Sequence, residues 1–261
     1  MSQSFSTITK DGAIAIVAIN HAPANALSSA CIADLRATFK QLGADDTVHA
    51  IIVTGEGRFF VAGADIKEFV EAFGNEQAAH EMAKAGQALC DEIEALTKPV
   101  IAAINGPALG GGLELALGCH YRIASQKAIL GLPELKLGLL PTFGGTQRLT
   151  HITSKAKAIE LILTSKQLSP EEAQTLGIVQ VVTPPEELMS TARATAQSFI
   201  ENKSMTSISR TIECIMQGTD LSLREGLALE SKRFAELFTT EDAQEGVQAF
   251  IEKREAKFNN R

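Results

Sequence analysis

Short apolar runs alternate with longer amphipathic segments through the first part of the chain. Runs of β-branched and aliphatic residues predict buried strands at Ile14–Ile19, Ala50–Thr54 and Val100–Ile104. Apolar residues at helical spacing predict helices at Cys31–Leu42 and at about Glu76–Leu96. Strands that alternate with helices need crossover connections, so we expect an α/β fold with mainly parallel strands.

The remainder of the chain is richer in helical patterns. Ser169, Pro170 and Glu172 combine an N-cap serine, a proline at the first helical position and a glutamate at the third, which predicts a helix start. One more short strand is expected at Val179–Val182, ended by two prolines. Four further helices are expected at Glu186–Ile200, Ser204–Met216, Leu223–Phe238 and Glu241–Phe258.

No Gly/Ser-rich or Pro-rich linker divides these two parts. Residues 1–185 are therefore interpreted as an α/β core, and residues 186–261 as a helical region that is not an independent domain.

Composition narrows the class of protein. The 261 residues are 45% apolar and 21% charged, which is ordinary for a soluble globular protein, and the net charge of −7 argues against nucleic-acid binding. The cysteines are scattered without a CxxC pair, and the histidines show no metal-ligand spacing, so neither zinc nor a disulfide framework is expected.

Residues 1–4 do not begin a signal peptide, and no apolar run approaches the roughly 18 residues of a membrane-spanning helix. A cytoplasmic protein is the expectation.

Three consecutive glycines, Gly110 to Gly112, stand between the third predicted strand and a helix that carries Glu114 in its first turn. Glycines supply no packing, but they let a ligand approach the backbone, and the free amides of a helix start suit a phosphate, a carboxylate or an oxyanion. The alternative is structural: close helix–strand packing, with Glu114 complementing the helix dipole. The segment matches neither a dinucleotide-binding fingerprint nor a Walker loop.

Two further segments are chemically suggestive. Asp65 and Glu68 form a capping pair by spacing, and Ala62-Gly63-Ala64 just before them leaves backbone without bulk. Glu134 follows Pro133 between apolar neighbours, which would raise its pKa and suit a general acid, although a loop glutamate facing water has the same signature.

Together these segments resemble the crotonase superfamily, specifically the enoyl-CoA hydratases. The resemblance covers nearly the whole chain, and its order and spacing are more specific than any single piece. The motifs that carry it are Pro23–Leu27, Ala62–Ile66, Asn105-Gly106, Gly110–Glu114, Pro133-Glu134, Gly144–Leu149 and Ala249–Arg254. The resemblance implies a spiral of repeated ββα units with a C-terminal helical trimerisation region, although no repeat is visible in the sequence itself.

The resemblance also implies roles. The substrate would be an acyl-CoA thioester whose oxygen lies between the amides of Ala64 and Gly111. Glu114 would be the base toward water and Glu134 the acid that delivers a proton to C2, hydrating a 2-trans-enoyl-CoA to a 3-hydroxyacyl-CoA. Expected substrate contacts are Ala24, Leu27, Ala62, Asp65, Ile66, Gly110, Pro133, Phe143 and Lys253, with residues 69–75 beside the acyl tail and Lys257 a further candidate for the CoA phosphates.

Other members of the class remain alternatives. A 3-enoyl-CoA isomerase shares the fold, and a non-catalytic acyl-CoA or RNA-binding protein is the rival from another class. Retention of both glutamates favours the hydratase. The resemblance implies no metal, no cofactor apart from the coenzyme A of the substrate, and a homo-hexamer built as a dimer of trimers; fatty-acid β-oxidation is the commonest use in the family.

Overall fold

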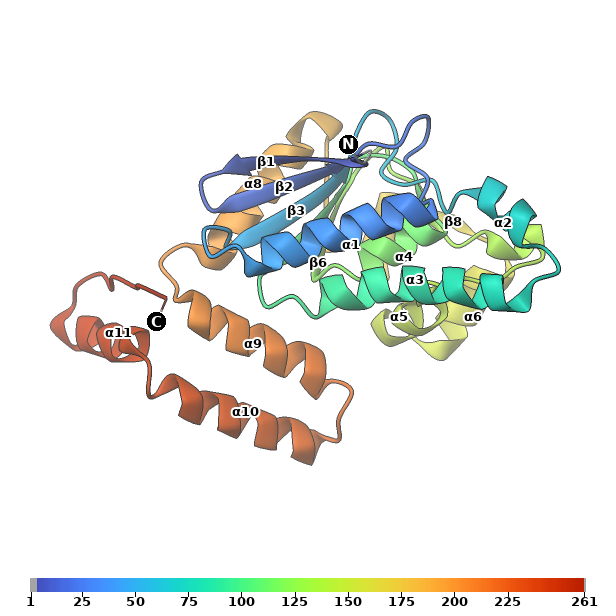
Figure 1. Cartoon of the computed structure of the whole chain (residues 1–261). Coiled ribbons are helices and arrows are strands. Elements are labelled where there is room, and N and C mark those ends of the chain that lie inside the picture. The colour runs from blue at the N-terminus through green and yellow to red at the C-terminus, as the bar shows by residue number, and fades with distance from the viewer. Residues whose placement is uncertain (1–3, 261) are drawn as a thin grey trace.

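A six-stranded sheet forms the centre of the computed structural model, which describes residues 4–260 (Figure 1). Its strand order is β1-β2-β3-β4-β6-β9, and every pair is parallel except β1 with β2. This confirms the mainly parallel α/β class. The strands are β1 Ser6–Asp11, β2 Ile14–Ile19, β3 Ala50–Gly55, β4 Val100–Ile104, β6 Tyr121–Ser125 and β9 Val181–Thr183.

A second layer of short extended segments follows the main strands. After β4 the chain forms β5 (Ala108–Leu109) and then α4 (Gly111–Leu117), and after β6 it forms β7 (Leu130–Gly131) and then the 3-10 helix η1 (Glu134–Leu137). After β2 and β3, the second layer consists of single parallel bridges, Leu27 with Ala64 and Val61 with Ala108. The repeated strand, short strand, helix order is the ββα spiral that the resemblance implied, and it is carried by backbone pairing because the sequence itself shows no repeat.

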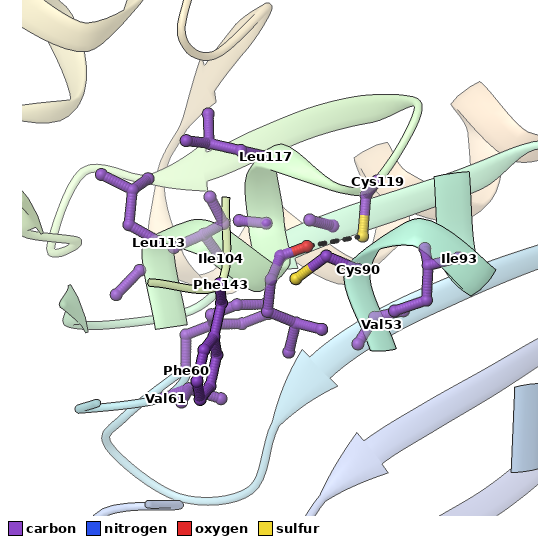
Figure 2. Close-up of a cluster of buried hydrophobic side chains, with 14 of the residues drawn as sticks. Val53, Phe60, Val61, Cys90, Ile93, Ile104, Leu113, Leu117, Cys119 and Phe143 are labelled. Atoms are coloured by element: carbon purple, nitrogen blue, oxygen red, sulfur yellow. Dashed lines mark hydrogen bonds between the residues drawn. The ribbon is translucent and has the colours of Figure 1, made fainter. Parts of the chain in front are cut away.

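Helices cover both faces of the main sheet (Figure 1). Side chains alternate along each strand, so Ile51 and Val53 enter one buried cluster while Ile52 enters another. The larger cluster includes α1 (Ser29–Ala44) and α3 (Glu76–Glu94), and part of it is drawn in Figure 2. The other is covered by α8 (Leu188–Ile200), through Leu188, Ala192, Ala196 and Ile200. The helix that begins just after residue 185 thus packs on the sheet.

The last helices extend away from the sheet (Figure 1). α9 (Met205–Gly218) and α10 (Leu223–Leu237) form an antiparallel hairpin without a single buried residue, followed by α11 (Glu241–Glu252). Large apolar side chains remain exposed there, including Leu223 at 80%, Phe238 at 68% and Phe250 at 85%. Remaining elements are α2 Ile66–Ala72, α5 Gly145–Ile152, α6 Lys155–Leu163, β8 Gln167–Leu168, α7 Pro170–Thr175 and the 3-10 helix η2 Pro185–Glu187.

The final predicted helix was too long. α11 ends at Glu252 instead of continuing to residue 258, because Lys253 adopts a left-handed conformation with φ 56°. The chain then folds back, and the buried Asp242 carboxylate accepts the backbone N–H groups of Asn259 at 2.7 Å and Asn260 at 3.1 Å. These bonds satisfy a buried charge, so tertiary contacts override the helical pattern.

Two expectations from the sequence concern membrane-spanning helices and an N-terminal leader. No helix in the described part of the chain is long and apolar enough to cross a membrane. The expectation about an N-terminal leader falls mostly on Met1–Gln3, which lie outside the described residues.

Candidate active site

A cavity of about 400 Å³ lies between α2, α3, η1 and the glycine-rich start of α4. Most of the residues expected from the sequence line it: Ala62, Ala64, Ile66, Gly110, Gly111, Glu114, Pro133, Glu134 and Phe143. The segment expected beside an acyl tail contributes Phe69, Ala72 and Phe73, so the rest of the wall is largely apolar. An apolar pocket with a few convergent polar groups is the usual form of a small-molecule site.

The backbone N–H groups of Ala64 and Gly111 border this cavity, and neither has a protein acceptor among residues 4–260. The N–H of Leu27 donates to the Gly63 carbonyl at 2.9 Å, and the Leu27 carbonyl accepts from Asp65 at 3.0 Å. These bonds fix the chain on both sides of Ala64 and leave its N–H free. Gly111 is the first residue of α4, where the N–H has no intrahelical partner.

Each of the three glycines has a different physical requirement. Gly110, the N-cap of α4, has φ 53° and ψ −127°, a conformation that residues with a Cβ avoid. A Cβ on Gly111 would lie 3.1 Å from the Phe143 ring, and one on Gly112 would lie 2.0 Å from the Val61 carbonyl oxygen. The structural alternative therefore accounts for Gly112, while Gly110 and Gly111 keep the backbone bare where it faces the cavity.

Glu114, in the first turn of α4, is buried, with 2% of its surface exposed. Its Oε1 accepts the backbone N–H groups of Phe143 at 2.8 Å and Gly145 at 2.7 Å, at the start of α5. Burial raises the pKa of Glu114 to about 7, the Gly145 N–H opposes that rise, and the negative charge of Glu134 adds to it. The group thus titrates in the neutral range, where proton transfer in either direction is accessible.

Glu134 reaches the same cavity from η1. Its Oε2 is buried and has no hydrogen-bond partner in the described part of the chain, while Oε1 would be 2.9 Å from a Cβ placed on Gly110. Burial raises the pKa of Glu134, as its apolar neighbours predicted. The side chain therefore faces the cavity instead of bulk water.

Three expected contact residues lie behind the cavity wall instead of on it. The Ala24 carbonyl accepts the N–H of Ala62 at 3.0 Å, and Leu27 makes the bonds that fix Ala64. Asp65 caps α2 by accepting the Lys67 N–H at 3.0 Å. These residues hold the lining segment in place.

The capping pair predicted for α2 forms only in part. Glu68 does not reach back to Asp65; its carboxylate accepts the N–H of Ser29 at 2.9 Å and the Ser29 hydroxyl at 2.7 Å. The start of α1 competes successfully for this side chain because its own N–H groups lack partners. Glu68 therefore ties α2, one wall of the cavity, to α1.

Lys253 lies at the end of α11 and does not line the cavity of its own chain. Its expected contact with a CoA phosphate therefore concerns a bound substrate or a neighbouring subunit, and stays a prediction. No group of three or more His, Cys, Asp or Glu side chains within the described chain is arranged to hold a metal ion.

The start of α5 is the functional feature that residue types did not reveal. The N–H groups of Phe143 and Gly145 donate to Glu114. In the sequence, this site could have been predicted from the Gly144-Gly145 pair at a helix start, because glycines at a helix start also marked α4. Phe143 belongs to the same buried cluster as Phe60 and Val61 (Figure 2), and its ring lies against the start of α4, 3.1 Å from a Cβ placed on Gly111. This packing fixes the peptide that holds the carboxylate.

Comparisons with known proteins agree with this arrangement. Residues 9–261 match the family described as Enoyl-CoA hydratase/isomerase. A probable enoyl-CoA hydratase of Bacillus subtilis is 47% identical over 97% of both chains, and a short-chain-enoyl-CoA hydratase of Clostridium acetobutylicum is 40% identical over 97% of both. A crystal structure of an enoyl-CoA hydratase from Bacillus anthracis superimposes with a TM-score of 0.92 at 34% identity, covering 99% of this chain and 100% of that one.

The fold and these matches define the class as the crotonase superfamily. This chain belongs to its enoyl-CoA hydratase/isomerase family, and the fold expected from the motifs is confirmed.

The raised pKa of Glu114 predicts a pH-dependent contribution to stability. The folded state binds the Glu114 proton more tightly than the unfolded state, whose pKa is near 4.5, so this contribution is fully present below that value and is lost as pH rises to about 7. Relative to Glu114→Gln, the wild-type free energy of unfolding should fall by up to about 3 kcal/mol across that interval. Denaturant unfolding of both proteins from pH 4 to 8, at one protein concentration, measures it; a constant difference contradicts the raised pKa.

Proposed function

We propose that this protein is an enoyl-CoA hydratase that adds water to a 2-trans-enoyl-CoA and gives a 3-hydroxyacyl-CoA. The observation that carries the proposal is that the buried Glu114 and the half-buried Glu134 line one apolar cavity together with the unpartnered N–H groups of Ala64 and Gly111. The names of the hydratase relatives, similar over nearly their whole length, support it.

The two N–H groups suit the charge that develops during the addition. Attack of water at C3 moves electrons through the C2–C3 double bond onto the thioester oxygen. Ala64 and Gly111 would donate to that oxygen, and the positive end of α4 behind Gly111 adds to their effect. Oxyanion donors of this kind are worth about 2.7–4 kcal/mol each.

The carboxyl groups would supply and remove the protons. Glu114 already accepts two backbone N–H bonds, which favour its charged form, so we assign it as the base that takes a proton from water. Glu134 Oε2 has no donor in the described chain, which favours the neutral form, so we assign it as the acid that protonates C2. One proton leaves water and one reaches carbon, so the addition is balanced with coenzyme A as part of the substrate and no further cofactor.

The acyl tail would lie against α2 and α3. Phe69 and Phe73 from α2, and Ala79, Met82 and Ala83 from α3, line the apolar part of the cavity. For the CoA phosphates we retain Lys253 and Lys257 as candidates, since the exposed end of the chain carries both.

The wider setting completes the proposal. We propose a homo-hexamer, built as a dimer of trimers, in the cytoplasm and acting in fatty-acid β-oxidation. The exposed apolar side chains of α10 and α11 support association, because they leave an apolar surface uncovered and the α9–α10 hairpin has no buried residue.

Conservative replacement tests the two carboxyl groups. Glu114→Gln and Glu134→Gln should each lower the kcat of hydration at least about 10²-fold, because each replacement removes one proton-transfer group. Glu171→Gln, at an exposed position in the first turn of α7, is the matched control and should leave kcat unchanged. A Glu114 or Glu134 variant whose kcat stays within about threefold of wild type would remove that residue from the mechanism.

Isotope labelling separates the hydratase from a 3-enoyl-CoA isomerase. Both need the amides, but only hydration places water at C3. In heavy-oxygen water, a short 2-trans-enoyl-CoA should give a product with one labelled hydroxyl, with kcat/KM at least about tenfold above that for isomerisation of the matched 3-enoyl-CoA. Faster isomerisation, or a product without label, favours the isomerase. Retention of acyl-CoA without turnover of either substrate favours the binding-only alternative; the charge of −7 already opposes RNA.

Light scattering after gel filtration tests the assembly. The expected mass is six times that of the 27.8 kDa chain, because burial of the exposed α10 and α11 side chains should stabilise association. Replacing Phe238 and Leu223 by serine should lower the mass, and Ile8→Ser, at a 39% exposed position on the sheet, is the control. A wild-type monomer at micromolar concentration rules the hexamer out.

A further inference from the structure

The guanidinium of Arg148 connects the start of α5 to α3. Its Nη2 donates to Asp91 Oδ1 and to Glu94 Oε2, both at 2.6 Å, and its Nε donates to Glu94 Oε2 at 3.0 Å. A further donor, Nη1, reaches the carbonyl of Phe143 at 3.0 Å. The Arg148 side chain is only 13% exposed, whereas its partners Glu94 and Asp91 are 34% and 65% exposed, so the bond to Asp91 is open to water and the others are partly buried.

Phe143 is held from both ends of its own backbone. Its N–H donates to Glu114 Oε1 and its carbonyl accepts from Arg148, while the Gly145 N–H makes the second bond to the same Glu114 oxygen. Gly144, with φ 105°, lies between these two donors, and a Cβ there would be 2.1 Å from Arg148 Nη1. The three-residue segment is therefore fixed between a carboxylate on one side and a guanidinium on the other.

We propose that Arg148 is a positioning residue for the candidate acid/base pair: it ties the Phe143 carbonyl to Asp91 and Glu94 of α3 and thereby fixes the two N–H groups that hold Glu114. The proposal deepens the proposed function and rests on it for its kinetic consequence. It does not require Arg148 to touch substrate, and Arg148 does not line the cavity.

The charged and titratable groups around Glu114 define how this would act. Glu134 faces it from η1 and raises its pKa, and Arg148 from α5 lowers it. On α3, the Cys90 thiol lies 3.7 Å from the Glu114 carbonyl, and Asp91 and Glu94 partly neutralise Arg148. Removing Arg148 would remove an attractive charge and would loosen two N–H donors, and both changes raise the pKa of Glu114.

The simpler role is structural, in which the ion pairs only join α5 to α3. That role predicts lower stability with unchanged chemistry per folded molecule. Positioning predicts instead a lower kcat with little change in KM, together with a shift of the acidic limb of the pH–rate profile to higher pH, because Glu114 must be ionised to act as base.

The experiment compares Arg148→Met and Arg148→Lys with Arg122→Lys. Lysine keeps the charge but cannot serve all three acceptors from one planar fork. Arg122 is also buried and donates at 2.6 Å to the carbonyls of Ile178 and Cys119, without contact to Glu114, so it controls for loss of a buried arginine. Circular dichroism establishes folding, and steady-state hydration assays from pH 5 to 9 give kcat, KM and the acidic limb.

We expect both Arg148 variants to lose at least about tenfold in kcat with KM within about threefold, and the limb to move up by at least about 0.5 pH unit, more for methionine than for lysine. The control should keep the wild-type limb. If Arg148→Met does not fold, Arg148→Lys decides alone. A folded Arg148 variant with wild-type kcat and limb overturns the proposal.

Difference infrared spectroscopy keeps this result separate from the proposed function. The protonated carboxyl band of Glu114, identified by its loss in Glu114→Gln, is titrated in wild type and in each Arg148 variant without substrate. A higher midpoint pH for this titration in the Arg148 variants supports the positioning role, even for a protein that hydrates nothing. In that case only the hydratase proposal fails. A midpoint pH equal to that of the wild type overturns the positioning role, whatever activity the variants have.

Discussion

Backbone hydrogen bonds between successive turns of the spiral are the interaction on which the candidate site depends. Gly63 accepts from Leu27, Val61 accepts from Leu109, and Gly131 accepts from Gly110, so four segments distant in sequence are aligned in the second layer. Next to these paired residues, some backbone N–H groups have no partner in the pairing. The unpartnered N–H groups of Ala64 and Gly111 are thus a product of the topology. Small side chains suit these positions because bulk would cover the N–H groups and, at Gly111, would also crowd the Phe143 ring.

The elements that sequence patterns predicted well are those buried on both faces. β3 and β4 are continuous apolar runs because helices cover both sides of a parallel sheet, and they were expected at nearly the observed bounds. β1 was missed because it is a polar edge strand, and the two-residue strands β5, β7 and β8 are too short to show a period. These short strands form because neighbouring turns of the spiral supply their hydrogen-bond partners. A short stretch of sequence does not contain that information.

The same distinction applies to the site. Glu114 and Glu134 could be singled out because a glutamate beside glycines or among apolar residues is unusual, and family motifs then gave each a role. Asp65, Ala24 and Leu27 were expected at the substrate; they do not line the cavity but hold its wall through hydrogen bonds, and their contact with a bound substrate stays a prediction. The N–H groups of Phe143 and Gly145 carry no residue signature at all, so only the folded chain shows that they hold a carboxylate.

Two residues of one type obtain different chemistry from this backbone. Both carboxyl groups are desolvated, which raises both pKa values, but the start of α5 donates two hydrogen bonds to Glu114 and none to Glu134. Donors favour the charged form of Glu114, but burial outweighs them, and the negative charge of Glu134 adds to the rise of its pKa to about 7. Repulsion between the two charges therefore opposes double ionisation, and the pair retains a proton to higher pH than an isolated carboxyl group would. The start of α5 therefore gives Glu114 hydrogen-bond donors that Glu134 lacks, and the residues that fix this helix start maintain the difference between the two carboxyl groups.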